Sequence, residues 1–332
     1  MNKIITLARR PEQIPDEKDF TITSGPIPEI KQGQILIKTL FLSADPYMRE
    51  RMDLSKSYMP EFKLNEMITG TLVGVVIESK SKQFSIGDTV YGFLGWQIYN
   101  VSDGTNISKV TNKSIPPQTA LGVLGSPGIT AYNGLLEIGK PKKGETIVIS
   151  GAAGAVGTLV GQIAKIYGCK VIGIVGSDEK CKYLIDELGF DACINYKTSL
   201  NIKEALEKIC TNGIDLYYDN VGNGLLNDII ELSNKKARII LCGQISQYNG
   251  SSPTINPKIL GLMTKKSITM QGFMIHDFIG EKSERAIQQI SLWIQQGQIQ
   301  YRENVIEGIE NAPKALIGLF TGQNIGKQLL KI

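Results

Sequence analysis

Residues 146–157 read TIVISGAAGAVG, an apolar run followed by closely spaced glycines. Thr146–Ser150 is a short apolar run, typical of a strand buried on both faces of a parallel sheet. Gly151, Gly154 and Gly157 follow it directly. Only glycines tolerate so tight a turn and so close an approach of the backbone to a pyrophosphate. The stretch therefore predicts a dinucleotide-binding loop, with a tight structural turn as the alternative interpretation.

The residues after the loop alternate between helix and strand patterns. A helix is predicted first, from apolar residues at helical spacing: Val156, Leu159, Val160, Ile163 and Ala164. Further strand-like runs are Lys170–Val175, Ala192–Tyr196, Asp215–Asp219, Arg238–Gly243 and Ser267–Gly272. This alternation predicts an α/β fold with a doubly wound parallel sheet of Rossmann type.

The part of the chain before the loop has a different pattern. Two runs rich in β-branched residues, Gln34–Ser43 and Ile68–Ile77, predict strands, and Phe84–Gly92 predicts a turn with a short strand. Together they indicate a β-rich, barrel-like antiparallel domain. A chain of 332 residues is long for one core, so two domains are expected.

The tail after the predicted helix at Glu281–Gln296 is expected to return to the first domain. It has strand candidates at Ile299–Tyr301 and Gln328–Lys331, around a helix near Ala312–Phe320. The predicted domains are therefore residues 1–125 with 297–332, and residues 126–296.

The end of the second predicted strand distinguishes NAD from NADP. An NAD enzyme usually places an acid there to bind the ribose 2′-hydroxyl. Here Gly176-Ser177 stands at that place, and Asp178 and Glu179 are expected in the first turn of a helix that continues to about Leu188. Lys180 would stabilise a 2′-phosphate, so the sequence favours NADPH. The alternative is that Lys180 is a solvated surface residue.

The distribution of histidine and cysteine argues against a catalytic zinc ion. The first 168 residues contain neither, and the only histidine is His276. A Cys₂His site cannot be assembled from the first domain, although a carboxylate-only site stays open. A Ser–His–Asp hydrolase is disfavoured because no G-x-S-x-G elbow is present. We predict no metal site, and the remaining chemistry is hydride transfer from a bound cofactor.

Composition excludes several other functions. The net charge of +4 comes from scattered lysines rather than a basic face, so no nucleic-acid partner is expected. No signal peptide or span of ~20 apolar residues is present, which indicates a cytoplasmic protein with no membrane partner. The cysteines form no C-x-x-C pair and are expected to be reduced, with a metal or redox role as the alternative: Cys169, Cys181, Cys193, Cys210 and Cys242.

Several motifs together resemble the prostaglandin reductase, leukotriene hydroxydehydrogenase and alkenal-one oxidoreductase family. They are SADPYMRERM (43–52), GSPGITAY (125–132), GAAGAVG (151–157), GSDEK (176–180), DNVG (219–222), CGQISQYN (242–249) and GQNIGK (322–327). This family belongs to the zinc-free medium-chain dehydrogenases/reductases. The resemblance covers nearly the whole chain. It implies a GroES-like catalytic domain, a Rossmann domain that binds NADPH, and a homodimer joined through the Rossmann sheets.

The resemblance also implies the reaction and the cofactor contacts. Hydride passes to the β-carbon of a small α,β-unsaturated ketone or aldehyde, and solvent protonates the resulting enolate. The implied cofactor-binding residues are Gly154, Ala155, Val156, Gly157, Lys180, Tyr196, Asn220, Cys242, Gly243, Gln244, Ile245, Ser246, Gln247, Tyr248, Phe273, Met274, Ile275 and Asn324.

Tyr248 is the candidate catalytic residue. Hydride transfer to an enone places negative charge on the carbonyl oxygen, which the neutral phenol would stabilise by donating a hydrogen bond. The alternative is that Tyr248 only packs on the cofactor. Candidate walls of the substrate pocket are Tyr47, Arg49, Phe93 and Trp96, although aromatic residues are more often core. We expect His276 to be a partly exposed structural residue rather than a general acid.

Two other functions stay open. A quinone reductase of the same superfamily would share the fold and the cofactor but deliver hydride to a quinone. A non-catalytic NADPH-binding protein would keep the same cofactor contacts.

Overall fold

The computed structural model describes residues 1–54, 57–111, 115–222, 224–250 and 256–332. It divides into two compact units, Met1–Gly122 with Glu303–Ile332, and Val123–Arg302. The tail therefore rejoins the first unit later than the predicted residue 297. Residues before 303 stay with the second unit because Gln162 binds the backbone of Gln300 twice, at 2.9 and 2.8 Å.

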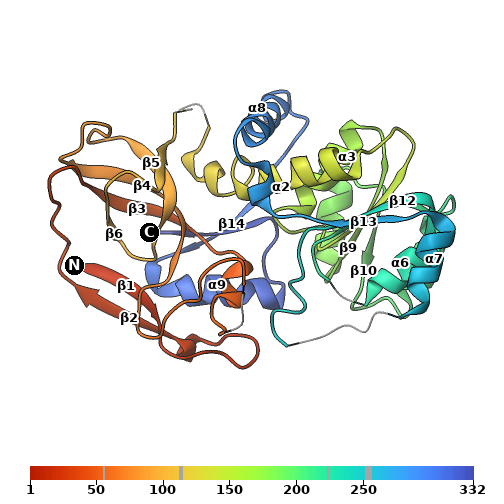
Figure 1. The fold of residues 1–332 in the computed structure, drawn as a ribbon, viewed down its shortest axis with the longest axis horizontal. Coiled ribbons are helices and arrows are strands. Elements are labelled where there is room, and N and C mark those ends of the chain that lie inside the picture. The colour runs from red at the N-terminus through yellow and green to blue at the C-terminus, as the bar shows by residue number, and fades with distance from the viewer. Residues whose placement is uncertain (55–56, 112–114, 223, 251–255) are drawn as a thin grey trace. The chain divides into compact units, whose positions relative to one another are not determined.

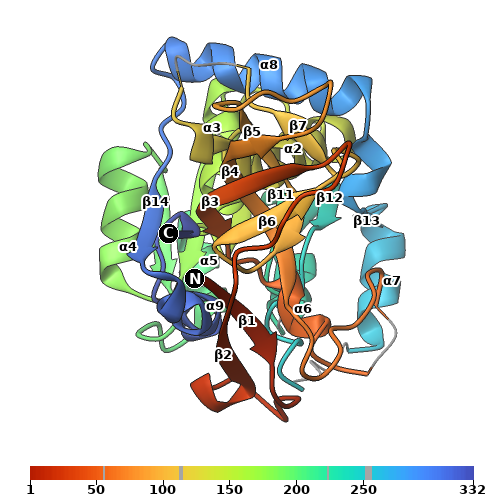
Figure 2. The same ribbon diagram turned by 90° about the vertical axis from the view of Figure 1, so that its left-hand side faces the viewer.

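The first unit is built on a β-sheet in the order β14-β15-β3-β4-β5-β7, with β6 also paired to β3. Its strands are β3 (Ile35–Ser43), β4 (Thr69–Ser79), β5 (Thr89–Gly95), β6 (Tyr99–Ser102), β7 (Ile107–Lys109), β14 (Glu303–Glu307) and β15 (Lys327–Lys331). All pairs except β14–β15 are antiparallel. A separate antiparallel pair, β1 (Asn2–Leu7) and β2 (Phe20–Gly25), lies below this sheet in Figure 2. The predicted β-rich domain is confirmed, with helices α1 (Tyr47–Glu50) and α9 (Ala312–Thr321) added to it.

The second unit contains a parallel sheet in the order β10-β9-β8-β11-β12-β13. Its strands are β8 (Thr146–Ser150), β9 (Lys170–Val175), β10 (Ala192–Asn195), β11 (Ile214–Asp219), β12 (Ser233–Leu241) and β13 (Thr269–Gly272). The doubly wound parallel sheet is confirmed. All side chains of β8 are buried, as its apolar composition predicted.

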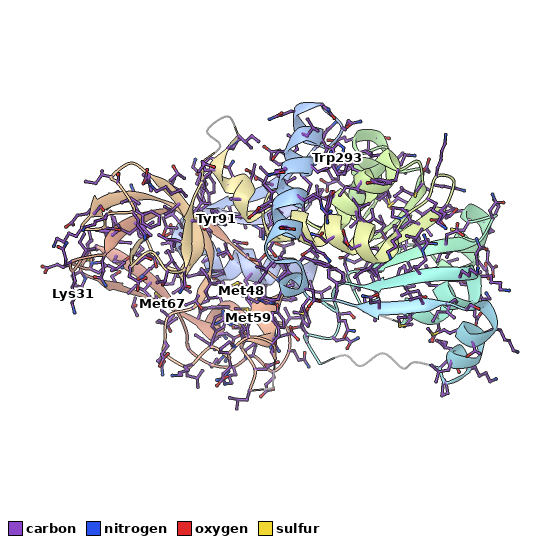
Figure 3. The ribbon with its side chains drawn as sticks, turned by 45° about the horizontal axis from the view of Figure 1, so that its top comes forward. Lys31, Met48, Met59, Met67, Tyr91 and Trp293 are labelled. Atoms are coloured by element: carbon purple, nitrogen blue, oxygen red, sulfur yellow. The ribbon has the colours of Figure 1, made fainter. Side chains whose placement is uncertain are left out.

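Helices cover both faces of the parallel sheet, as Figure 1 shows. On one face lie α5 (Ile202–Ile209), α6 (Leu225–Leu232) and α7 (Lys258–Lys266), whose apolar residues share a core with Val148, Ile172 and Tyr217. On the other face lie α2 (Ser126–Asn133), α3 (Gly157–Ile166) and α4 (Asp178–Lys182). Helix α8 (Glu281–Gln295) packs on α2. The ring centre of Trp293 on α8, labelled in Figure 3, is 5.9 Å from the ring centre of Tyr132 on α2.

The strand order fixes where a ligand would bind in the second unit. From β8 the chain winds outward through β9 and β10, then crosses back to β11 and winds the other way through β12 and β13. Connections therefore leave the carboxyl ends of β8 and β11 in opposite directions. Doubly wound sheets bind ligands in the crevice at this point, beyond the carboxyl ends of the strands.

Two predicted elements differ from the structure. The helix expected from Ser177 to Leu188 is α4 followed by a π-helical turn at Tyr183–Glu187. The strand expected at Ile299–Tyr301 is wrong, because these residues connect α8 to β14, which begins at Glu303. In the part of the chain that is described, no helix is long and apolar enough to cross a membrane.

Candidate cofactor-binding site

The glycine loop between β8 and α3 is closed at one end and open in the middle. A Cβ atom at Gly157 would lie 2.6 Å from the carbonyl oxygen of Gly151 and 2.7 Å from Cα of Ala152. Only glycine therefore lets α3 pack this closely on the loop. Gly151 has φ +57°, the left-handed conformation that favours glycine. A Cβ at Gly154 would meet only the Gly151 oxygen, at 3.3 Å, so the loop stays open above Gly154.

The backbone at the start of α3 has donors available for an anion. Within the described residues, the N–H groups of Ala155 and Val156 donate no hydrogen bond, and both residues are only half-buried. They precede the N-terminus of α3, where the helix dipole favours negative charge. The loop therefore fits the pyrophosphate that the sequence predicts at Gly154, Ala155, Val156 and Gly157.

Asp219, at the end of β11, organises the neighbouring turn, and sequence reasoning did not select it. Its Oδ1 atom accepts hydrogen bonds from the side chains of Ser150 (2.6 Å) and Tyr217 (3.1 Å). The same atom accepts from the backbone N–H groups of Val221 (3.0 Å) and Gly222 (3.1 Å). Asp219 is buried. An acid at the end of the strand that pairs with β8 was the signal available in the sequence.

Asn220 and the Cys242–Tyr248 segment are held against this turn. The Asn220 side chain donates to the Ser150 carbonyl at 2.8 Å, which ties the end of β11 to the end of β8. The backbone N–H groups of Cys242 and Gly243 donate to the Asp219 carbonyl, at 2.9 and 3.1 Å. Further along, the backbone of Ser246 and the side chain of Gln247 donate to carbonyls of the turn at Val221 and Gly222.

The arrangement places most of the predicted cofactor residues at one edge of the sheet. Gln244 packs on Gly222, where a Cβ would lie 2.8 Å from the Gln244 Cβ. Ile245 lies in the same loop, and Tyr248 is half-buried within it. Burial raises the pKa of the Cys242 thiol to about 12, and the thiol lies near the Tyr218 hydroxyl.

At the carboxyl ends of β9 and β10, the same edge of the sheet carries Lys180, Tyr196 and Lys197, which we call the cationic corner. Ser177 caps α4 by accepting a hydrogen bond from the Lys180 backbone, so Asp178 and Glu179 lie in the first helical turn, as predicted. The Asn195 side-chain amide donates a hydrogen bond to the Asp178 carboxylate at 2.7 Å. Lys180 is half-buried rather than freely solvated.

Lys180 and Lys197 lie near each other in this corner, and Glu179 offsets part of their charge. Burial lowers the pKa of Lys180, and the nearby Lys197 lowers it further. The Tyr196 hydroxyl lies against Gly176, and a Cβ atom at Gly176 would be 2.9 Å from the hydroxyl oxygen. Two cations and a hydroxyl beside a helix cap fit a phosphate group.

The segment after β13 reaches the same edge of the sheet. The Phe273 ring packs on Gly134, and a Cβ atom at Gly134 would lie 2.6 Å from Cζ of Phe273. The ring centres of Phe273 and Phe278 are 5.5 Å apart. Met274 is exposed, and Ile275 begins a short 3₁₀ helix. His276, expected to be a partly exposed structural residue, is exposed, and its structural role stays a prediction.

In the first unit, Tyr47 and Phe93 both lie near Arg51. The half-buried Tyr47 begins α1, and its ring centre is 6.4 Å from that of Tyr58. Burial, and then the Asp45 carboxylate, raise the pKa of Tyr47, so its phenol stays neutral. The Arg51 guanidinium lies 5.4 Å from the centre of the half-buried Phe93 ring.

Arg51 itself was not selected from the sequence. Its guanidinium stacks 4.0 Å from the Phe62 ring centre and donates to the Pro60 and Thr69 carbonyls, at 2.8 and 3.1 Å. Within the described residues it forms no ion pair. Burial lowers its pKa, and Tyr47 offsets part of that shift. The spacing of Tyr47 and Arg51, one helical turn apart, was the available signal.

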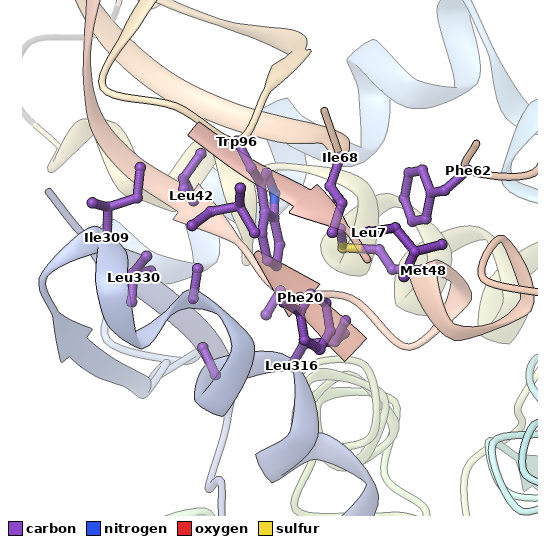
Figure 4. Packing of buried hydrophobic residues seen from close by; sticks show 14 of the residues in the cluster. Leu7, Phe20, Leu42, Met48, Phe62, Ile68, Trp96, Ile309, Leu316 and Leu330 are labelled. Atoms are coloured by element: carbon purple, nitrogen blue, oxygen red, sulfur yellow. The ribbon is translucent and has the colours of Figure 1, made fainter. Parts of the chain in front are cut away.

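Two predicted pocket walls belong to the interior instead. Trp96 is 1% exposed and packs among Leu42, Ile68 and Leu316, as Figure 4 shows. Its large apolar ring fills the space between β3 and α9. Arg49 is 2% exposed and pairs with Asp53 at 2.7 Å, so it anchors α1 rather than lining a pocket.

Asn324, predicted to reach the cofactor from the tail, lies in the loop between α9 and β15 of the first unit. Its side chain donates to the Gly326 carbonyl at 2.9 Å, and the residue is half-buried. Its contact with a cofactor stays a prediction.

Comparisons with known proteins match both units. A family model described as the N-terminal domain of oxidoreductase matches residues 3–110, and one described as zinc-binding dehydrogenase matches residues 155–291. Despite the second description, the described residues hold no group of three or more His, Cys, Asp or Glu that could bind a metal ion.

Individual relatives extend over almost the whole chain. The NADPH-dependent curcumin reductase of Escherichia coli is 39% identical, over 100% of this chain and 97% of its own. Prostaglandin reductase 1 of Bos taurus is 42% identical, over 96% and 95%. Among solved structures, Vibrio vulnificus CurA in complex with NADPH is 44% identical, covers 99% of this chain and 98% of its own, and has a TM-score of 0.94. Escherichia coli quinone oxidoreductase, at 20% identity over both full chains and a TM-score of 0.78, shares the fold alone.

Proposed function

This chain belongs to the prostaglandin, alkenal and curcumin reductase family of medium-chain dehydrogenases/reductases, and from that membership we infer that it reduces carbon–carbon double bonds with NADPH. The substrates are small α,β-unsaturated ketones and aldehydes. The observation that carries this conclusion is full-length identity of about two residues in five to curcumin and prostaglandin reductases, against 20% to a quinone oxidoreductase.

The second unit holds the cofactor. NADPH supplies the hydride, from C4 of its nicotinamide. The N–H groups of Ala155 and Val156 bind the pyrophosphate, and Lys180, Lys197 and Tyr196 bind the 2′-phosphate. Asn220, the Cys242–Tyr248 segment and Phe273–Ile275 complete the predicted cofactor contacts of the second unit. The cationic corner and the open loop above Gly154 support these assignments.

Tyr248 acts on the substrate. As hydride arrives at the β-carbon, negative charge develops on the carbonyl oxygen, and the Tyr248 hydroxyl stabilises it by donating a hydrogen bond. Solvent then protonates the α-carbon. In the first unit, Tyr47, whose phenol stays neutral, and Phe93, whose ring lies near the Arg51 guanidinium, remain the predicted substrate-pocket residues.

A turnover screen tests the proposed function. We expect NADPH oxidation, followed at 340 nm, with simple enones and enals, and slower oxidation with simple quinones. Faster turnover of quinones would favour the quinone reductase. NADPH binding without oxidation by any enone would favour a non-catalytic binding protein.

Replacing Lys180 tests the choice of cofactor. Lys180→Met should raise the Kd for NADPH about 10- to 100-fold, because a charge-assisted contact with the 2′-phosphate is lost. The Kd for NADH should not change. Lys182→Met, which removes an exposed lysine from the same helix, is the matched control. Equal weakening of both cofactors would contradict the assignment.

We also propose that the protein is a homodimer. Strand β13 is the last strand of the parallel sheet in the described part of the chain, and most of its residues are exposed. An exposed edge strand offers unpaired backbone groups to a second strand. Pairing of β13 with its copy about a two-fold axis would satisfy them. Light scattering of the purified protein checks this, and a monomer mass would contradict it.

A further inference from the structure

Two cysteines meet beside the cationic corner of the second unit. Cys181 lies on α4 and Cys193 on β10, and the two thiols lie close enough to shift each other's pKa. Helix α4 packs directly on β10. Both cysteines are free and only half-buried, unlike the buried Cys169 and Cys210.

A second contact fixes the register of this helix and strand. The Asn195 side chain donates to the Asp178 carboxylate at 2.7 Å. Asp178 and Cys181 are three residues apart and share a face of α4, whereas Cys193 and Asn195 are two residues apart and share a face of β10. The Asp178–Asn195 pair therefore lies one helical turn from the Cys181–Cys193 pair, on the same interface.

The cysteine pair is attached to residues that hold the proposed 2′-phosphate. Cys181 directly follows Lys180, and Tyr196 follows Cys193 by three residues. A disulfide requires the two sulfurs to lie about 2.05 Å apart and the two Cβ atoms about 3.8 Å apart. A disulfide between the two cysteines would join α4 to β10 directly beside Lys180.

We propose that Cys181 and Cys193 form a reversible disulfide, closed by a hydroperoxide and reopened by a dithiol, and that the closed form binds NADPH more weakly. The inference rests on NADPH as the cofactor of this site. The site is a covalent modification site distinct from the catalytic residues, and it couples the oxidation state of the protein to cofactor affinity.

The chemistry balances as a two-electron oxidation of two thiols. The Cys181 sulfur attacks the peroxide, so that an S–O bond forms, the O–O bond breaks and an alcohol or water leaves. The Cys193 sulfur then attacks the Cys181 sulfur, the S–S bond forms, and water leaves with the Cys193 proton. Burial raises the pKa of both thiols, so the reaction is slow at neutral pH and an excess of peroxide is needed.

Peptide mapping and cofactor titration test the proposal on the full chain. Reduced protein is treated with excess hydrogen peroxide, alkylated, digested with trypsin and analysed by mass spectrometry. We expect a cross-link between the peptide Cys181-Lys182 and the peptide Tyr183–Lys197. The Kd for NADPH, from its fluorescence, should rise on the order of tenfold and return after dithiothreitol. By linkage, NADPH should disfavour the disulfide by the same factor in a dithiol–disulfide buffer.

Variants separate this pair from other thiols. Cys181→Ser and Cys193→Ser should each bind NADPH normally when reduced and lose both the cross-link and the peroxide effect. Cys210→Ala should retain both. Absence of the cross-link after full peroxide treatment would overturn the proposal, as would a cross-linked protein with unchanged NADPH affinity. If the reduced protein bound no NADPH at all, the proposed function would fail instead, and the cross-link would still be seen by mass.

Discussion

Asp219→Ala should lower the free energy of unfolding by about 3–5 kcal/mol and weaken NADPH binding on the order of tenfold or more. The Asp219 Oδ1 atom accepts from Ser150, Tyr217, Val221 and Gly222, and alanine leaves these donors without their buried acceptor. Each unsatisfied buried group costs about 1–3 kcal/mol, although relaxation makes the total smaller than the sum. The turn would then no longer hold the proposed cofactor segment, and small displacements at a binding site cost large factors.

Asp219→Asn is the matched control for the alanine variant. Asparagine keeps one carbonyl oxygen in the place of Oδ1, and therefore keeps the acceptor while losing the charge. Neutral hydrogen bonds are roughly half as strong as charge-assisted ones, so the expected loss is about 1–2 kcal/mol with near-normal NADPH binding. Urea denaturation and NADPH fluorescence measure the two effects. Equal, small losses for both variants would show that the turn does not depend on this acceptor.

Tyr248→Phe should lower kcat/KM for an enone about 100-fold and leave the Kd for NADPH unchanged. The phenol is the donor proposed for the developing oxyanion, and loss of one such donor typically costs about 10²–10³ in rate. Phenylalanine preserves the ring and its packing. The comparison therefore measures the hydroxyl alone.

Tyr167→Phe controls for the loss of a tyrosine hydroxyl from the second unit, because Tyr167 lies at the exposed end of α3. It should leave both constants unchanged. If Tyr248→Phe kept its full kcat/KM, Tyr248 would have no part in the reaction. If Tyr248→Phe raised the Kd for NADPH and left kcat at saturating NADPH unchanged, Tyr248 would only pack on the cofactor.

The sequence predicted the second unit closely because its features are local. The apolar run Thr146–Ser150 and the three glycines after it lie in consecutive residues, and the structure places them as β8 and the loop before α3. The same holds for the helix start at Ser177, where a cap and an acidic first turn need only neighbouring residues. The parallel sheet followed from repetition of such local patterns.

Tertiary contacts decided the roles of residues whose partners are distant in sequence. Trp96 is interior, packed by residues distant in the sequence, and Arg51 lies near the rings of Phe62 and Phe93. Asp219 was inconspicuous because its partner Ser150 is 69 residues away. The Cys181–Cys193 contact likewise required α4 to pack on β10.

The parallel sheet, the glycine loop between β8 and α3 and the lack of Cys and His in the first 168 residues all follow from the sequence alone. These depend on residue type and short spacing, which set backbone conformation and donor chemistry directly. Only the tertiary structure decided which polar groups are buried together and which aromatic rings are core. Burial depends on packing between segments far apart in the chain, and no local pattern specifies it.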